Sequence, residues 1–132
     1  MRPPPRALGG RRGDQGQAAV ELALVLPLVV ALALILCQVA LVVRDQVLVV
    51  HAAREAGRAA AVDADPGAAR QAALASGPLD GARLDVDVAG RGEAGSRVRV
   101  TVRYRSATDL PLVGSMVGDV DLSGTATLRV EN

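Results

Sequence analysis

Hydrophobic and polar residues are arranged in three different patterns along this chain of 132 residues. Residues 22–43 form an uninterrupted run of 22 uncharged, mostly apolar side chains. An α-helix of that length covers about 33 Å, which is close to the hydrocarbon thickness of a bilayer. A chain of this size cannot build a core that surrounds such a helix on all sides. The run therefore predicts one membrane-spanning helix.

Helical spacing continues beyond the apolar run to about Val62. Polar side chains recur on one face, at Arg44, His51, Glu55 and Arg58. Small residues lie on the other face at intervals of four, as Ala52, Ala56 and Ala60 and as Ala53, Gly57 and Ala61. Small side chains let another backbone approach closely, so we expect helix contacts on this face. We also expect a contact at Gln38, because an amide in the outer half of a membrane span seeks a hydrogen-bond partner on another helix.

A short second helix and three strands are predicted after Val62. Asp65 offers an N-cap, Pro66 a first helical residue and Gly77 a stop, which frames the short helix. From residue 83 onward apolar and polar residues alternate with a period of two, which is typical of half-buried strands. The predicted strands are 84–88, 97–105 and 119–131.

The charges on these strands predict their order. The middle strand carries arginines on its polar face, whereas both other strands carry aspartates, so cross-strand attraction favours the middle strand between the other two. We expect an α+β fold in which the long helix and the short helix cover the apolar face of a three-stranded antiparallel sheet. Gly124 interrupts the inward row of the third strand, where we expect a bulge or a close helix contact.

These patterns divide the chain into a basic disordered leader (1–16), a helix that spans the membrane and extends beyond it (17–62) and a small module (63–132). The basic residues before the span are Arg2, Arg6, Arg11 and Arg12. Positive charge on this side predicts a cytoplasmic N-terminus and an extracytoplasmic module. A cleavable secretory signal is the alternative, but its apolar core normally has only about 7–15 residues.

Composition argues against catalysis. The chain has no Trp or Phe and a single Tyr, so any core must consist of Val, Leu and Ala. Cys37 is the only cysteine and His51 the only histidine, so neither a disulfide nor a catalytic triad nor a zinc site can be assembled. Glycines at 90, 92 and 95 match a dinucleotide-binding pattern, but a strand follows them where that site needs a helix. We therefore expect a hairpin loop, no enzyme activity and no cofactor.

Two further segments could contact a partner, and the sequence does not identify it. The arginines of the middle strand lack interleaved aromatic residues, and we expect them to face the aspartates of neighbouring strands, so nucleic acid is not an expected partner. Residues 109–118 form an apolar connector that either folds over the sheet edge and completes the core or is exposed as a contact loop.

A processing signal stands at the head of the apolar run. Glu21 lies five residues after Gly16, and no other glycine before it has a glutamate at this distance. This arrangement resembles the cleavage site of type IV pilins, and with the basic leader and the long helix it is most similar to the TadE-like proteins of tight-adherence pilus systems. The resemblance covers residues 16–43. It implies cleavage between Gly16 and Gln17 by a prepilin peptidase, and a bilayer, other pilin-like subunits and assembly proteins as partners.

Two functions fit the sequence. The first is a pilin-like minor component or assembly factor of a tight-adherence pilus or related secretion system. The second is a permanently anchored module whose sheet binds a partner in the cell envelope. A capping box formed by Asp14 and Gln17 would start the helix without any peptidase. Cleavage after Gly16 separates the two functions.

Overall fold

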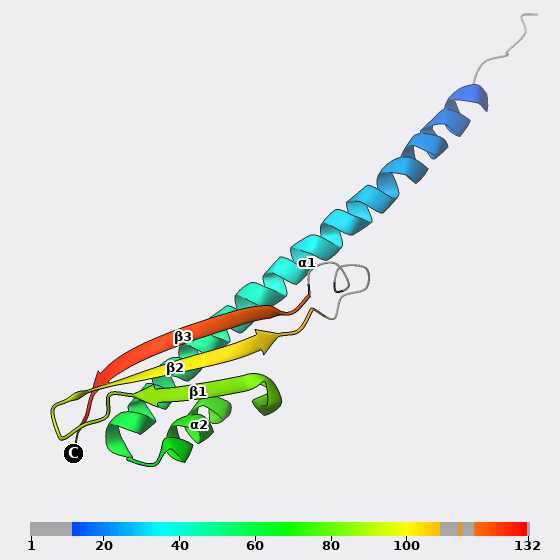
Figure 1. Cartoon of the computed structure of the whole chain (residues 1–132). Coiled ribbons are helices and arrows are strands. Elements are labelled where there is room, and N and C mark those ends of the chain that lie inside the picture. The colour runs from blue at the N-terminus through cyan, green and yellow to red at the C-terminus, as the bar shows by residue number, and fades with distance from the viewer. Residues whose placement is uncertain (1–11, 109–113, 115–117, 132) are drawn as a thin grey trace, which may run out of the picture. The chain divides into compact units, whose positions relative to one another are not determined.

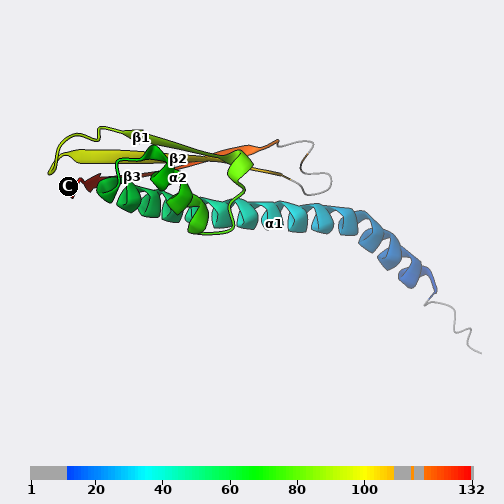
Figure 2. The ribbon, with the colours of Figure 1, turned by 90° about the horizontal axis from the view of Figure 1, so that it is seen from below.

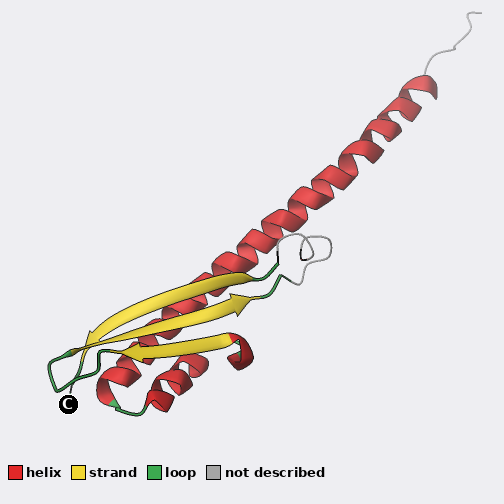
Figure 3. Cartoon of the chain, in the orientation of Figure 1, coloured by secondary structure: helices red, strands yellow, loops and turns green. Residues whose placement is uncertain are grey.

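The structure is a computed structural model that describes residues 12–108, 114 and 118–131. Its elements are α1 (Arg12–Val62), α2 (Pro66–Ala75), the short 3₁₀ helix η1 (Gly81–Arg83), β1 (Leu84–Ala89), β2 (Arg97–Ser106) and β3 (Val120–Arg129) (Figures 1 and 3). The three strands form one antiparallel sheet. The predicted α+β class, with a long first helix and a short second one, is confirmed.

The long helix begins earlier than its pattern predicts. Residues 12–16, which we assign to the leader from the sequence, are helical, and α1 then continues through Pro27 to Val62. Residues 1–11 lie outside the described residues, so the division into leader, helix and module stays a prediction. By contact, the chain forms two compact units, Met1–Ile35 and Leu36–Asn132.

In the first unit the apolar side chains of α1 are exposed. Leu22, Leu24 and Leu28 leave 64%, 75% and 70% of their surface uncovered. Exposed apolar surface on this scale is unfavourable in water and favourable in lipid. Among the described residues, one helix is long and apolar enough to cross a membrane, and it contains this segment. The finding supports a single-pass membrane protein.

In the second unit the strand order is β1-β2-β3, so β2 lies in the middle as the charge pattern predicts. The register pairs Val86 with Val102, and Val100 with Ala126. Alternation along β2 buries Val98, Val100 and Val102 completely and leaves Arg97, Arg99 and Arg103 exposed on the other face. The sheet therefore has one apolar and one polar face, as its period of two predicts.

Both helices lie on the apolar face of the sheet (Figure 2). The buried core consists of Val49, Ala52, Ala53, Ala56, Ala60, Ala61, Ala69, Ala73, Leu84, Val98, Val100, Val102, Leu122 and Val130. No aromatic residue belongs to this buried cluster, and its largest fully buried side chains are valines. Because alanine and glycine fill the helix side, the core is thin and the backbones of helix and sheet come close together.

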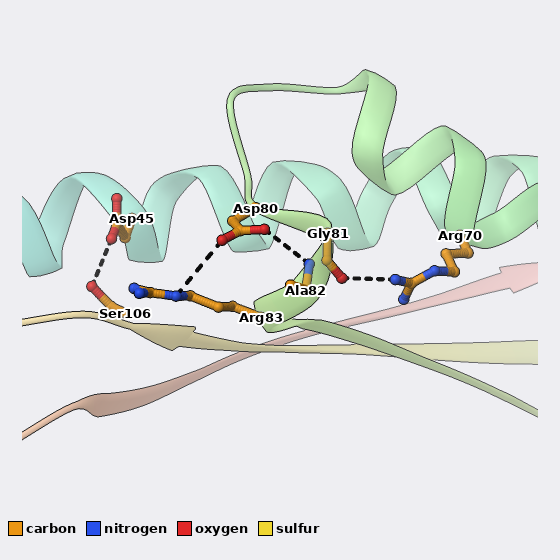
Figure 4. Close-up of polar contacts among 7 residues, drawn as sticks. All are labelled: Asp45, Arg70, Asp80, Gly81, Ala82, Arg83 and Ser106. Atoms are coloured by element: carbon orange, nitrogen blue, oxygen red, sulfur yellow. Dashed lines mark hydrogen bonds and ion pairs between the residues drawn. The ribbon is translucent and has the colours of Figure 1, made fainter.

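Polar caps hold α2 against the sheet. The Asp65 carboxylate accepts a hydrogen bond from the backbone N–H of Gly67 at 2.9 Å, which confirms the predicted N-cap. Arg70 donates to the carbonyl oxygen of Gly81 at 2.8 Å (Figure 4). It also donates to the carbonyl oxygen of Leu84 at 2.7 Å. One guanidinium thus links α2 to η1 and to the start of β1.

Candidate processing site and helix contact surface

The predicted processing site lies on an exposed part of α1. Gly16, Gln17 and Glu21 are all exposed, and a Cβ added at Gly16 would meet no atom within 4 Å. Gln17 and Glu21 are four residues apart, so they share one helix face and are separated by about 6 Å along the axis. A charge created at the backbone nitrogen of Gln17 would therefore lie one turn from the Glu21 carboxylate.

The alternative role of Asp14 as an N-cap is not realised. The helix begins at Arg12, so Asp14 lies inside it rather than at its end. A capping box between Asp14 and Gln17 requires a non-helical backbone at the capping residue. The residues around Gly16 are therefore not explained by helix capping.

The small-residue face of α1, which we define as Ala52, Ala53, Ala56, Gly57 and Ala60, is buried within the chain. At Gly57 an added Cβ would overlap Leu128 Cδ1 and lie 3.2 Å from Ala126 Cβ, both on β3. This face covers the sheet, as we expect from the sequence. Its residues are consequently buried within the chain, with Gly57 against β3, and their use between subunits stays a prediction.

A second close approach lies at Gly124 on β3. A Cβ there would be 2.9 Å from the carbonyl oxygen of Val49 and 3.1 Å from Cα of Val50. Beside it, the Gln46 side-chain amide donates to the carbonyl oxygen of Ser123 at 3.1 Å. Of the two alternatives predicted for Gly124, the close helix contact is confirmed, because only a residue without a side chain lets the two backbones touch here.

Gln38 finds a partner in its own chain. Its side chain is only 6% exposed, and Nε2 donates to Oγ1 of Thr108 at 3.1 Å. Thr108 Oγ1 in turn donates to the carbonyl oxygen of Gly118 at 2.6 Å. Gln38 Oε1 is buried without a hydrogen-bond partner in the described part of the chain. The amide is thus held where the sheet meets α1, and a bond to another helix stays a prediction. Most of the connector 109–118 lies outside the described residues.

Sequence reasoning missed two further links between α1 and the sheet. Ser106 Oγ donates to the Asp45 carboxylate at 2.6 Å (Figure 4). At the other end of the helix, Arg91 donates to the carbonyl oxygen of Ala60 at 2.6 Å, which satisfies one of the orphan acceptors of the last turn. No local pattern marks these residues, because each bond joins segments far apart in the sequence.

The arginines of β2 do not all face aspartates, which corrects our expectation. Arg103 lies 3.7 Å from Asp85, and Arg105 lies 3.4 Å from Asp121. At the other end of β2 the register places Arg97 opposite Arg129, and Arg99 between Ala89 and Thr127. The sequence pattern gives the face of each side chain, but the register decides which charges meet.

Nothing in the described residues forms a metal centre, since no three His, Cys, Asp or Glu side chains cluster there. Two hollows in the part of the chain that the structure describes are both open to solvent. One lies over the ion-paired end of the sheet, around Arg103 and Arg105. The other lies along α1, between Gln46 and Arg54. Neither encloses a small molecule in the way that ligand sites usually do.

Comparison with known proteins gives one match. Residues 16–58 match the family model described as TadE-like protein. No curated protein and no solved structure matches the chain. The matched segment begins at the candidate processing glycine and contains the exposed apolar helix and most of the small-residue face. Residues 16–58 are therefore similar to the TadE-like family, and this segment contains the glycine and the glutamate at the head of the helix.

Proposed function

We propose that the protein is a pilin-like, single-pass subunit that acts as a minor component or assembly factor of a tight-adherence pilus or related secretion system. The observation that carries this proposal is Gly16, five residues before Glu21, at the head of an exposed apolar helix inside the TadE-like segment. The role is structural rather than catalytic. Its partners are the lipid bilayer, other pilin-like subunits and the assembly proteins of the system.

The orientation follows from charge. Arginines precede the span, and such residues stay on the cytoplasmic side. Gly16 and Glu21 then lie at the cytoplasmic edge of the bilayer, where a prepilin peptidase acts. The unit that contains the sheet is extracytoplasmic.

Cleavage between Gly16 and Gln17 would change the charge at the head of the helix. The new α-amine is protonated at neutral pH, and it lies one turn from Glu21. A carboxylate at the edge of the hydrocarbon region is costly without a partner, and the amine of its own or a neighbouring subunit offsets that cost. Pairing between subunits would also set the axial register of neighbouring helices. Assembly would therefore depend on processing.

Gly16 itself suits a cleavage site within a helix. A glycine in a helix interior is less favourable than alanine by about 1 kcal/mol, so α1 unwinds more easily here than over the leucine-rich run. Apart from the helix's own backbone, no described atom lies within 4 Å of a Cβ at Gly16, which leaves the position open to a peptidase.

Mass spectrometry of the protein from its native host, with the peptidase gene present and deleted, tests the proposal. We expect a mature chain beginning at Gln17 only when the peptidase is present. Gly16→Trp should keep the leader and fail to assemble, whereas the control Gly10→Trp should be processed normally. An intact leader in both hosts, together with normal assembly of Gly16→Trp, would refute processing.

One observation favours a second function. Helix α1 runs from Arg12 through Gly16 without a break, as expected of a permanent anchor. In that case the leader is part of the anchor, and the sheet binds a partner in the cell envelope. The same mass spectra decide between the two functions, since a permanent anchor retains its leader in either host.

A further inference from the structure

We propose that one end of the polar sheet face binds a linear polyanion through its phosphate groups. The site is the arginine patch, which we define as Arg97, Arg99 and Arg129. This inference goes beyond the pilus role, which concerns the helix and its processing. It rests on the register of the sheet and on the charges that the register brings together.

The arginine patch combines three exposed cations on one face. Arg97 is directly opposite Arg129 in the register, and Arg99 follows two positions along the same strand. Directly opposite residues have Cβ atoms about 5 Å apart, and residues two apart on a strand are separated by about 7 Å. In the described part of the chain, none of the three lies within 4.0 Å of a carboxylate, whereas Arg83, Arg103 and Arg105 each do.

This arrangement is unfavourable for the isolated module. Like charges directly opposite one another destabilise an antiparallel pair. The other end of the same strands avoids the problem by setting Asp121 opposite Arg105. The nearest acidic residues in the sequence, Glu93 and Glu131, are exposed and form no ion pair with the patch. An exposed patch that keeps an unneutralised like-charge pair is suited to an anionic partner.

The surroundings of the patch favour phosphate. A guanidinium binds phosphate through two parallel hydrogen bonds. Hydroxyl groups continue the face, at the exposed Thr127 and Thr125 and at the half-buried Thr101, whose Oγ1 lies 3.4 Å from that of Thr125. The described polar face carries no aromatic or large apolar side chain. Uncharged sugars and protein hot spots need such side chains, so a chain held by charge and hydrogen bonds fits better than either.

The distance of the patch from the end of the apolar run argues against the protein's own bilayer as the anion. The patch end of the sheet adjoins the end of α1, because the backbone N–H of Glu131 donates to the carbonyl oxygen of Ala61 at 3.0 Å. Ala61 follows the last residue of the apolar run, Val43, by about 27 Å along the helix axis. This is more than three Debye lengths at physiological salt, each about 8 Å. With the proposed orientation the ligand is therefore a polymer of the envelope or beyond it.

Binding is measured on the full chain in nanodiscs of zwitterionic phosphatidylcholine, with fluorescent polyphosphate and with an oligothymidylate as probes. Three phosphate contacts predict a slope of log K against log salt of about −2, so affinity falls about 18-fold between 50 and 200 mM salt. Two variants matched in charge are compared. The patch variant is Arg97→Gln/Arg99→Gln/Arg129→Gln, and the control is Arg83→Gln/Arg103→Gln/Arg105→Gln, whose arginines are all ion-paired.

We expect the patch variant to lose at least about 10-fold in affinity and most of the salt slope, and the control to change by less than about 3-fold. Binding of both probes assigns phosphate chains in general, and binding of polyphosphate alone assigns a phosphoanhydride polymer. An equal loss in both variants would overturn the proposal in favour of non-specific attraction. Equal or tighter binding of poly-glutamate would point to an acidic protein, and binding only with phosphatidylglycerol nanodiscs would point to a lipid surface.

Two controls separate binding from folding and from processing. Removal of the Arg97–Arg129 repulsion should leave the unfolding temperature of the patch variant unchanged or higher. If that variant does not fold, the single change Arg129→Gln is used, and it should remove about one third of the salt slope. Gly16→Trp, which keeps its leader, should bind polyphosphate as the unmodified chain does, so failure of the pilus proposal leaves this result unaffected.

Discussion

Gly124→Ala tests the closest approach in the core with one methyl group. An added Cβ would lie 2.9 Å from the carbonyl oxygen of Val49, 3.2 Å from its carbonyl carbon and 3.1 Å from Cα of Val50. All three are backbone atoms, so no side-chain rotation can relieve the overlap. Overpacking of this kind costs about 1–3 kcal/mol, and replacing glycine with alanine in a strand returns about 0.4–1 kcal/mol. We expect a net loss of about 1.5 kcal/mol.

Thermal unfolding of the full chain in detergent, followed by circular dichroism, measures this loss. For a unit of up to about 100 residues, 1.5 kcal/mol lowers the unfolding temperature by about 6–12 °C. Gly57→Ala is the comparison, because its overlap is with Leu128 Cδ1, the end of a flexible side chain, and alanine favours the helix by about 1 kcal/mol. We expect a smaller change there. Unaltered or higher stability of Gly124→Ala would refute the contact between the β3 and α1 backbones.

The remaining predictions concern the helix, a cap and the topology. A fragment that starts at Asp63 lacks the α1 half of the core and should show no cooperative unfolding, and a cooperative transition above about 60 °C would contradict this. Asp65→Ala removes the N-cap of α2 and should lower stability by about 1 kcal/mol in thermal unfolding, whereas Asp87→Ala, on the exposed sheet face, should change it by less than about 0.5 kcal/mol. Ala94→Cys in a Cys37→Ala background should react with a membrane-impermeant thiol reagent on intact cells, and labelling only after lysis would reverse the proposed orientation.

Local sequence patterns predicted most of the fold. The period of two along β2 and β3 marked the strands and the buried valines Val98, Val100 and Val102. Asp65 predicted the start of α2, and the missing side chain at Gly124 predicted the close contact with the helix. These features are predictable because each depends on neighbouring residues or on a side chain that must be absent. The glycine-to-glutamate spacing likewise located the candidate processing site without any tertiary information.

Long-range pairings were not predictable in the same way. Gln38 and Thr108 are 70 positions apart, and an apolar run does not show whether lipid or protein will surround a given turn. The arginine patch depends on register, because sliding β3 by two residues keeps every side chain on its face but changes the partner of Arg97. The Gln38–Thr108 bond and the arginine patch could therefore be identified only from the three-dimensional structure.

The contact between Gly124 and the backbone of α1 also sets an order of events during synthesis. Helix α1 is complete at Val62, whereas β3 begins only at Val120. Contacts between segments so far apart form late, since the intervening chain must close first. In the proposed topology, the small-residue face emerges from the membrane before β3 has been made. Gly57 on this face then stays exposed until β3 has been exported and has packed against it. A neighbouring helix or an assembly factor therefore has access to this face only on the growing chain, and arrival of β3 ends that access.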